Sequence, residues 1–218
     1  MKRISMLLSL IVNVLIVFGQ NTGKQNFYVG TFTSEGAKGI YLCEFDSKTV
    51  EITLKQTFLG IDNPNFLKIS PDKKYLYAVN RAPKEIESTG GYISAYEIGK
   101  NGNLNFLNKQ LSHGSDPCYV DVSPDGKFVA VANYGGGTTA LYRVANNGSL
   151  LAASSVIRNE VSRINTARKT KTIAHSIKFY PFENKIFIAY LEIDQLNILD
   201  LKVTKLVQND KKVLTLQP

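Results

Sequence analysis

A repeated hairpin motif is the feature that most constrains the fold of this chain. Three segments align with one another, and each consists of an apolar stretch, a Pro-containing turn and a second apolar stretch. Their shared prolines are Pro71, Pro124 and Pro181, which lie 53 and 57 residues apart. Pro presets the first backbone angle of a turn, and Asp or Gly tolerates the tight conformation that follows. Each copy is therefore predicted to be two strands joined by a short turn, at 63–80, 116–133 and 173–190.

Each predicted hairpin is followed by a second pair of strands. Apolar and polar residues nearly alternate in the stretches 91–98, 138–144 and 195–200, and Asn-Gly turns follow the first two. Both patterns are hairpin signals. Four strands in a repeating unit of about 50 residues are typical of a propeller blade. A β-sandwich of short strands is the alternative, but a sandwich needs no such repeat. We therefore predict an all-β chain that folds as a β-propeller.

The repeats account for part of a propeller. An opening strand pair is predicted at 26–32 and 39–45, before the first copy of the repeat. With it, the chain from Phe27 to Pro218 holds about 3.5–4 four-stranded blades of this length,. Such a partial propeller leaves an edge strand and a blade face uncovered. We therefore expect self-association through the exposed blade edge.

The N-terminal segment has the pattern of a signal peptide. Lys2 and Arg3 precede an apolar stretch from Met6 to Phe18, and Gly19 is a small residue near a suitable cleavage point. This stretch is shorter than the roughly 20 residues that a bilayer-spanning helix needs. We predict a signal peptide at 1–20 and a partial propeller domain at 21–218. The protein is then exported, periplasmic or extracellular, without membrane contact after cleavage, and a retained membrane anchor is the alternative.

Charge and cysteine content narrow the function classes. The formal net charge is +8. The basic residues late in the chain indicate either a solvated loop or a site for an anionic substrate. Nucleic-acid binding is not expected, because no basic motif is interleaved with aromatic residues. Cys43 and Cys118 lie in strand-like stretches and are predicted to be buried free thiols, although export also permits a disulfide. The sequence contains no Cys/His cluster that would hold a metal.

Several motifs resemble the lactonase family of seven-bladed β-propellers, which includes propeller-type 6-phosphogluconolactonases and carboxymuconate cyclases. The chain carries Tyr-Val-Gly-Thr-Phe-Thr at 28–33, Asn-Pro-Asn-Phe-Leu at 63–67 and Tyr-Ala-Val-Asn at 77–80. It also carries Ser-Pro-Asp-Gly at 123–126 and Ala-Asn-Tyr followed by three glycines at 132–137. These motifs occur in the family's order and cover about the first half of a family member. The family's Gly-Pro-Arg-His motif is expected beyond Pro218.

The resemblance implies a small anionic sugar lactone as substrate. It also implies a hydrolysis that needs neither a cofactor nor a metal. Lactone hydrolysis requires a base that activates water and positive donors near the carbonyl oxygen. Histidine titrates near neutrality, and the arginine fork fits a phosphate, a carboxylate or an oxyanion. His175 is accordingly the predicted catalytic base and Arg168 the predicted anion binder. Asn133, Tyr134 and Asp116 are predicted to bind substrate, although the Gly triplet after Tyr134 is also consistent with a simple turn.

Some positions depart from the family pattern. The run that ends in Ala174-His175-Ser176 has Thr172 and Ile173 where the resemblance predicts Pro and His. Arg81 stands where an acidic residue is common. Two interpretations of function remain open. The first is a lactonase-like hydrolase that opens a sugar lactone such as 6-phosphogluconolactone without a metal. The second is a truncated, non-catalytic propeller remnant that acts at most as a ligand-binding or protein-binding module.

Overall fold

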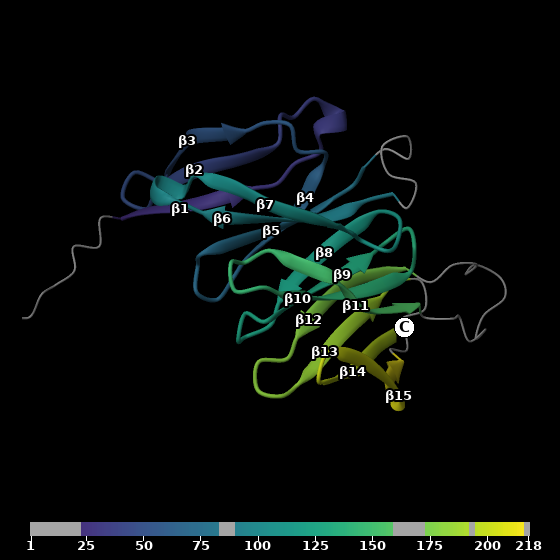
Figure 1. Cartoon of the computed structure of the whole chain (residues 1–218). Helices are drawn as coiled ribbons and strands as arrows, with labels where there is room; N and C mark the ends of the chain where they lie inside the picture. Colours follow the sequence, from purple (N-terminus) through teal and green to yellow (C-terminus); the bar gives the residue numbers. More distant parts are fainter. Residues whose placement is uncertain (1–22, 83–89, 159–172, 192–194, 216–218) are drawn as a thin grey trace, which may run out of the picture.

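The chain forms a fan of antiparallel sheets, which confirms the predicted all-β propeller architecture (Figure 1). The computed structural model describes residues 23–82, 90–158, 173–191 and 195–215. The predicted signal peptide at 1–20 lies outside these residues. Within the described ranges, helical structure consists of two 3₁₀ turns, η1 (Thr33–Glu35) and η2 (Lys100–Gly102). No helix in these ranges is long and apolar enough to cross a bilayer.

Four sheets follow one another along the chain as blades 1 to 4. Blade 1 has three strands and blades 2 to 4 have four, and each four-stranded blade is a simple meander. The strands of blade 1 are β1 (Lys24–Val29), β2 (Ile40–Asp46) and β3 (Glu51–Phe58), and those of blade 2 are β4 (Pro64–Ile69), β5 (Tyr75–Asn80), β6 (Tyr92–Ile98) and β7 (Leu104–Leu111). The strands of blade 3 are β8 (Pro117–Val122), β9 (Phe128–Asn133), β10 (Thr138–Val144) and β11 (Leu150–Arg158), and those of blade 4 are β12 (Ala174–Phe179), β13 (Lys185–Tyr190), β14 (Gln195–Lys202) and β15 (Lys205–Thr215).

The predicted turns close the first hairpin of blades 2 and 3 with the same chemistry. In blade 2 the Ser70 hydroxyl donates to Asp72 at 2.6 Å and accepts from the Tyr75 amide at 3.0 Å. In blade 3 the hydroxyl of Ser123 bridges Asp125 and the next strand in the same way, at 2.7 and 2.9 Å. The hydrogen bond from Ser70 holds the pKa of Asp72 below its usual range. The Ser-Pro-Asp motif therefore repeats because its side chains satisfy the turn's own polar groups.

The cores lie between blades rather than within them. Blades 2 and 3 bury Tyr77, Val79, Val131 and Tyr142 against one another. A second cluster fills the boundary between blades 3 and 4, and a smaller one lies between blades 1 and 2. The first strands of blades 2, 3 and 4, called the inner strands below, contact one another in sequence: β4 packs against β8 and β8 against β12. Adjacent blades thus cover each other's apolar faces.

The two cysteines are free, as predicted, and lie in different blades. Cys43 is buried in β2 as predicted, whereas Cys118 in β8 is only half-buried. The alternative of a disulfide is wrong.

One glycine at the boundary between blades 2 and 3 permits a stability test. Gly148 has a φ of +83°, and a Cβ there would lie 2.1 Å from a ring carbon of Tyr75. Gly126 has a similar φ of +73°, but a Cβ there would meet no atom within 4 Å. Both changes to alanine strain the backbone, and only Gly148→Ala also overpacks the boundary. We expect Gly148→Ala to lower the free energy of unfolding by about 1–3 kcal/mol more than Gly126→Ala does.

The measurement is a urea denaturation curve for each variant beside the parent chain. Equal losses of stability for the two variants would show that the turn at Gly148 does not press against blade 2.

Candidate active site at the propeller rim

One edge of the fan collects the predicted site residues. In each four-stranded blade the inner strand begins beside the end of the second strand, because the two strands are paired antiparallel. The pairs at this edge are Pro64 with Asn80, Pro117 with Asn133, and Ala174 with Tyr190. Loops before the inner strands and after the second strands therefore meet here. We call this edge the rim.

Four residues form a continuous arc along the rim from blade 2 to blade 4. The Arg81 Nε atom lies 3.8 Å from Asp116 Oδ1. The Tyr134 amide donates to the Asp116 carbonyl oxygen at 2.9 Å. The rings of Tyr134 and His175 meet edge to face with their centroids 5.9 Å apart. Of the predicted site residues, the structure therefore brings Asp116, Tyr134 and His175 together.

The backbone around Asp116 is built to present its carboxylate. Asp116 has a φ of 53°, which is unusual for a residue other than Gly and particularly before a proline,. A Cβ on Gly135 would lie 2.1 Å from Asp116 Oδ2, so any larger residue there would displace this carboxylate from its present position. The glycine triplet thus forms a tight turn beside the carboxylate, and contact of this loop with substrate stays a prediction.

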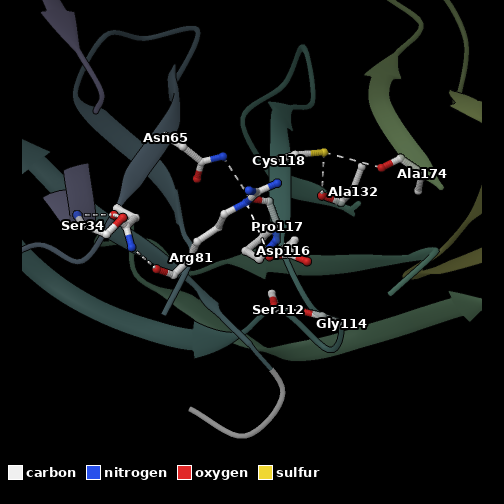
Figure 2. Close-up of polar contacts among 11 residues, drawn as sticks. Ser34, Asn65, Arg81, Ser112, Gly114, Asp116, Pro117, Cys118, Ala132 and Ala174 are labelled. Carbon is white, nitrogen blue, oxygen red and sulfur yellow. Dashed lines mark hydrogen bonds and ion pairs between the residues drawn. The ribbon is translucent and has the colours of Figure 1, made fainter. Parts of the chain in front are cut away.

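His175 is exposed near the start of β12, so its imidazole is open to a substrate. Behind its backbone lies Cys118 on the neighbouring inner strand, whose thiol donates to the carbonyl oxygens of His175 at 3.4 Å and Ala174 at 3.5 Å. Figure 2 shows the Cys118 sulfur directed at Ala132 and Ala174. Burial raises the pKa of the Cys118 thiol to about 11, against the opposing charge of Arg81. The thiol is therefore neutral at physiological pH and ties β8 to β12.

Asn133 lies beneath the arc. It is fully buried, and its amide nitrogen donates to the Ser112 carbonyl oxygen at 2.8 Å and to the Thr138 hydroxyl at 3.0 Å. Its Oδ1 atom is buried and has no hydrogen-bond partner in the described structure. The contacts of Asn133 hold the loop that carries Tyr134, and direct contact of Asn133 with substrate stays a prediction.

Arg81 is the functional candidate that sequence reasoning did not select. Figure 2 shows its side chain extending from the end of β5 towards Asn65 and Asp116. Its Nε atom is buried and has no hydrogen-bond partner in the described structure, where Asp116 at 3.8 Å is its ion-pair partner. The alignment of the repeats contained the signal, because Arg81 follows Asn80 just as Tyr134 follows Asn133.

The inner strands also carry a shared charge cluster. Asp121 on β8 is buried and lies 2.8 Å from the ammonium of Lys68 on β4 and 3.9 Å from that of Lys178 on β12. Its second oxygen accepts from the Phe179 amide at 3.0 Å. One carboxylate against two ammonium groups leaves this part of the inner strands positively charged, which suits an anionic ligand.

The remaining observations concern Arg168 and metal binding. Arg168 lies outside the described residues. Within the described ranges no group of three or more His, Cys, Asp or Glu side chains is arranged to hold a metal ion.

Known proteins similar to this chain share its architecture. The 6-phosphogluconolactonase of Bacillus subtilis is 33% identical over 176 residues, which are 80% of this chain and 49% of that protein. That of Formosa agariphila is 30% identical over 169 residues, 77% of this chain and 47% of that protein. A crystal structure from Bacteroides fragilis, provisionally named a 6-phosphogluconolactonase, superposes with a TM-score of 0.80 at 28% identity. The superposition covers 91% of this chain and 56% of the Bacteroides fragilis chain. The chain thus spans about half the length of the curated relatives it matches.

The family model described as "Lactonase, 7-bladed beta-propeller" matches residues 26–218. This range includes every residue of the rim arc and all four blades apart from Lys24 and Gln25 at the start of β1. The repeat, the sheet order and the matched range agree, and the chain belongs to the lactonase family of seven-bladed β-propellers.

Proposed function

We propose that this protein is a metal-independent lactonase that opens a sugar lactone such as 6-phosphogluconolactone. The observation that carries the proposal is the rim arc, which joins an exposed imidazole at His175 to a guanidinium at Arg81 through Asp116 and Tyr134. The names of the relatives from Bacillus subtilis and Formosa agariphila support the same substrate class.

The proposed reaction is attack of water on the lactone carbonyl. The His175 imidazole accepts a proton from the water as the water oxygen forms a bond to the carbonyl carbon. The C–O bond to the ring oxygen then breaks, and the imidazolium returns the proton to that oxygen. The product is a hydroxy acid, which ionises in water, so no redox partner or cofactor is needed. Arg168, seven positions before His175 in the sequence, retains its predicted role as an anion binder near the carbonyl oxygen.

Arg81 is proposed to bind the phosphate of the substrate at the other end of the arc. Its planar guanidinium can donate to two phosphate oxygens. Asp116 lies on its Nε side at 3.8 Å, which is longer than a hydrogen bond, and so orients the guanidinium without saturating it,. The net positive charge of Lys68 and Lys178 around Asp121 lies further along the inner strands from the rim and adds a longer-range attraction for an anion,.

The role of His175 has a matched internal control, because the chain contains 2 histidines. We expect His175→Asn to lower kcat/KM for 6-phosphogluconolactone by about a hundredfold, or about 2.7 kcal/mol of transition-state stabilisation. His113→Asn changes the other histidine, which is exposed in a rim loop at a φ of 59° that asparagine tolerates,. It should leave turnover unchanged.

The measurement is the hydrolysis rate above the spontaneous rate, with and without EDTA. Absence of turnover in the parent chain, or equal rates for the two variants, would favour the non-catalytic interpretation. Inactivation by EDTA would contradict metal independence.

Arg81 is tested by comparing two substrates. We expect Arg81→Met to raise KM for 6-phosphogluconolactone by about tenfold or more, because a charge-assisted phosphate contact is lost. Its KM for unphosphorylated glucono-δ-lactone should not change. Arg143→Met removes an exposed arginine of β10 and serves as the control. Equal losses on both substrates would place Arg81 at the reacting carbonyl instead.

The Cys118 thiol permits a test of the attacking group. Because its pKa is raised to about 11, the thiolate is scarce at neutral pH. We expect iodoacetamide to modify Cys118 slowly at pH 7 to 8 and progressively faster as the pH approaches 11, followed by mass spectrometry of the modified peptide. Cys118→Ala should retain turnover, since water is the nucleophile. A covalent adduct between Cys118 and substrate would contradict this mechanism.

A further inference from the structure

A surface cavity of about 570 Å³ lies between blades 1 and 2, apart from the rim arc. Its walls are the end of β3, the connection from β3 to β4, and parts of β6 and β7. This volume is in the range of small-molecule sites in proteins. None of the four arc residues lines it.

The cavity exists because this blade boundary closes differently from the next one. Between blades 2 and 3 the Tyr142 hydroxyl donates to the Leu111 carbonyl oxygen at 2.6 Å. There Asn108 also bonds both the amide and the carbonyl of Leu150, at 2.9 and 2.8 Å. Tyr96 occupies in blade 2 the position that Tyr142 occupies in blade 3. Tyr96 pairs with Leu76, the second residue of β5, and Tyr142 pairs with Val129, the second residue of β9. Its ring lines the open cavity instead.

Two opposite charges line the cavity, and both contact Tyr92, one at its hydroxyl and the other over its ring. Tyr92 donates a short hydrogen bond to Asp62 Oδ2. The Lys109 ammonium lies 4.2 Å from the centroid of the Tyr92 ring, in cation–π geometry,. In the described part of the chain no ion pair joins Asp62 to Lys109, although both face the same space. The cavity therefore presents a carboxylate and an ammonium that are held apart.

The remaining wall is apolar and partly open to solvent. Phe106 is 59% exposed and meets the Tyr96 ring edge to face at 5.7 Å, and Leu59 is 68% exposed. Leu104 lies beside them. Burial raises the pKa of Tyr96 to about 12, so its hydroxyl stays protonated at neutral pH. This wall offers rings and aliphatic carbons to a large apolar group.

We propose that this cavity binds a free α-amino acid with a large apolar side chain. The ligand's ammonium pairs with Asp62, its carboxylate pairs with Lys109, and its side chain packs against Tyr96 and Phe106. Such a zwitterion satisfies both charges at once. A simple anion would pair with Lys109 but leave its other end facing Asp62, and a simple amine would do the reverse. The proposal does not rest on the lactonase activity.

The experiment is isothermal titration of the 218-residue chain with L-phenylalanine. 3-Phenylpropanoate, which lacks the ammonium, and phenethylamine, which lacks the carboxylate, are titrated in parallel. We expect saturable binding of L-phenylalanine, with each of the two analogues weaker by about tenfold or more. Equal affinity for either analogue, or no saturation by L-phenylalanine up to about 10 mM, would overturn the proposal.

Variants locate the binding. Lys109→Met and Asp62→Asn should each weaken L-phenylalanine binding by about tenfold, and Asp62→Asn retains an acceptor for Tyr92. Lys109 is exposed, so its loss leaves the fold intact, and a thermal melt of each variant verifies this. Lys127→Met is the control, because it removes an exposed lysine that pairs with Asp125 in the turn of blade 3. Binding that is unchanged in Lys109→Met, or equally weakened in Lys127→Met, would show that the ligand is held elsewhere.

Discussion

The packing of one blade against the next is the interaction on which the rest of the structure depends. A four-stranded antiparallel sheet has two faces, and a blade buries them only against its neighbours. Val79 and Tyr77 of blade 2 are completely buried because blade 3 covers them, and Val131 and Tyr142 are buried in return. A change at a blade boundary therefore affects two sheets at once, which is why the glycine beside Tyr75 is constrained more strongly than one in an open turn.

The same packing brings the rim residues together. A buried asparagine ends the second strand in blades 2 and 3, and its side chain donates to the backbone that leads into the inner strand. Asn80 donates to the Asp62 carbonyl oxygen at 3.0 Å, and Asn133 donates to the Ser112 carbonyl oxygen at 2.8 Å. Because the side-chain nitrogens of both asparagines donate inward, the next residues, Arg81 and Tyr134, lie at the rim. The rim arc thus depends on one repeat position, the asparagine, turning inward, and on the next position lying at the rim.

Local sequence signals predicted the hairpins well, since Ser-Pro-Asp and Asn-Gly turns depend on neighbours along the chain. The convergence of Asp116, Tyr134 and His175 was also foreseeable, because the start of each inner strand and the end of each second strand lie at one edge of the blades. The inward position of Asn133 and the extension of Arg81 towards Asp116 depend on contacts between blades, and no local pattern encodes them. The cavity beside Tyr96 was unpredictable for the same reason: Tyr96 and Tyr142 match in sequence but meet different neighbours.

The buried charge on the inner strands connects stability to function. Asp121 is desolvated by blade packing, and a lone buried carboxylate is costly unless it is compensated. Lys68 and Lys178 arrive from the two flanking blades, so compensation requires that blades 2, 3 and 4 be assembled. Because two ammonium groups face one carboxylate, assembly also leaves a positive charge on the inner strands. The ion cluster that is consistent only with packed blades is therefore also a source of positive charge, on which the proposed lactonase function would draw to attract an anion.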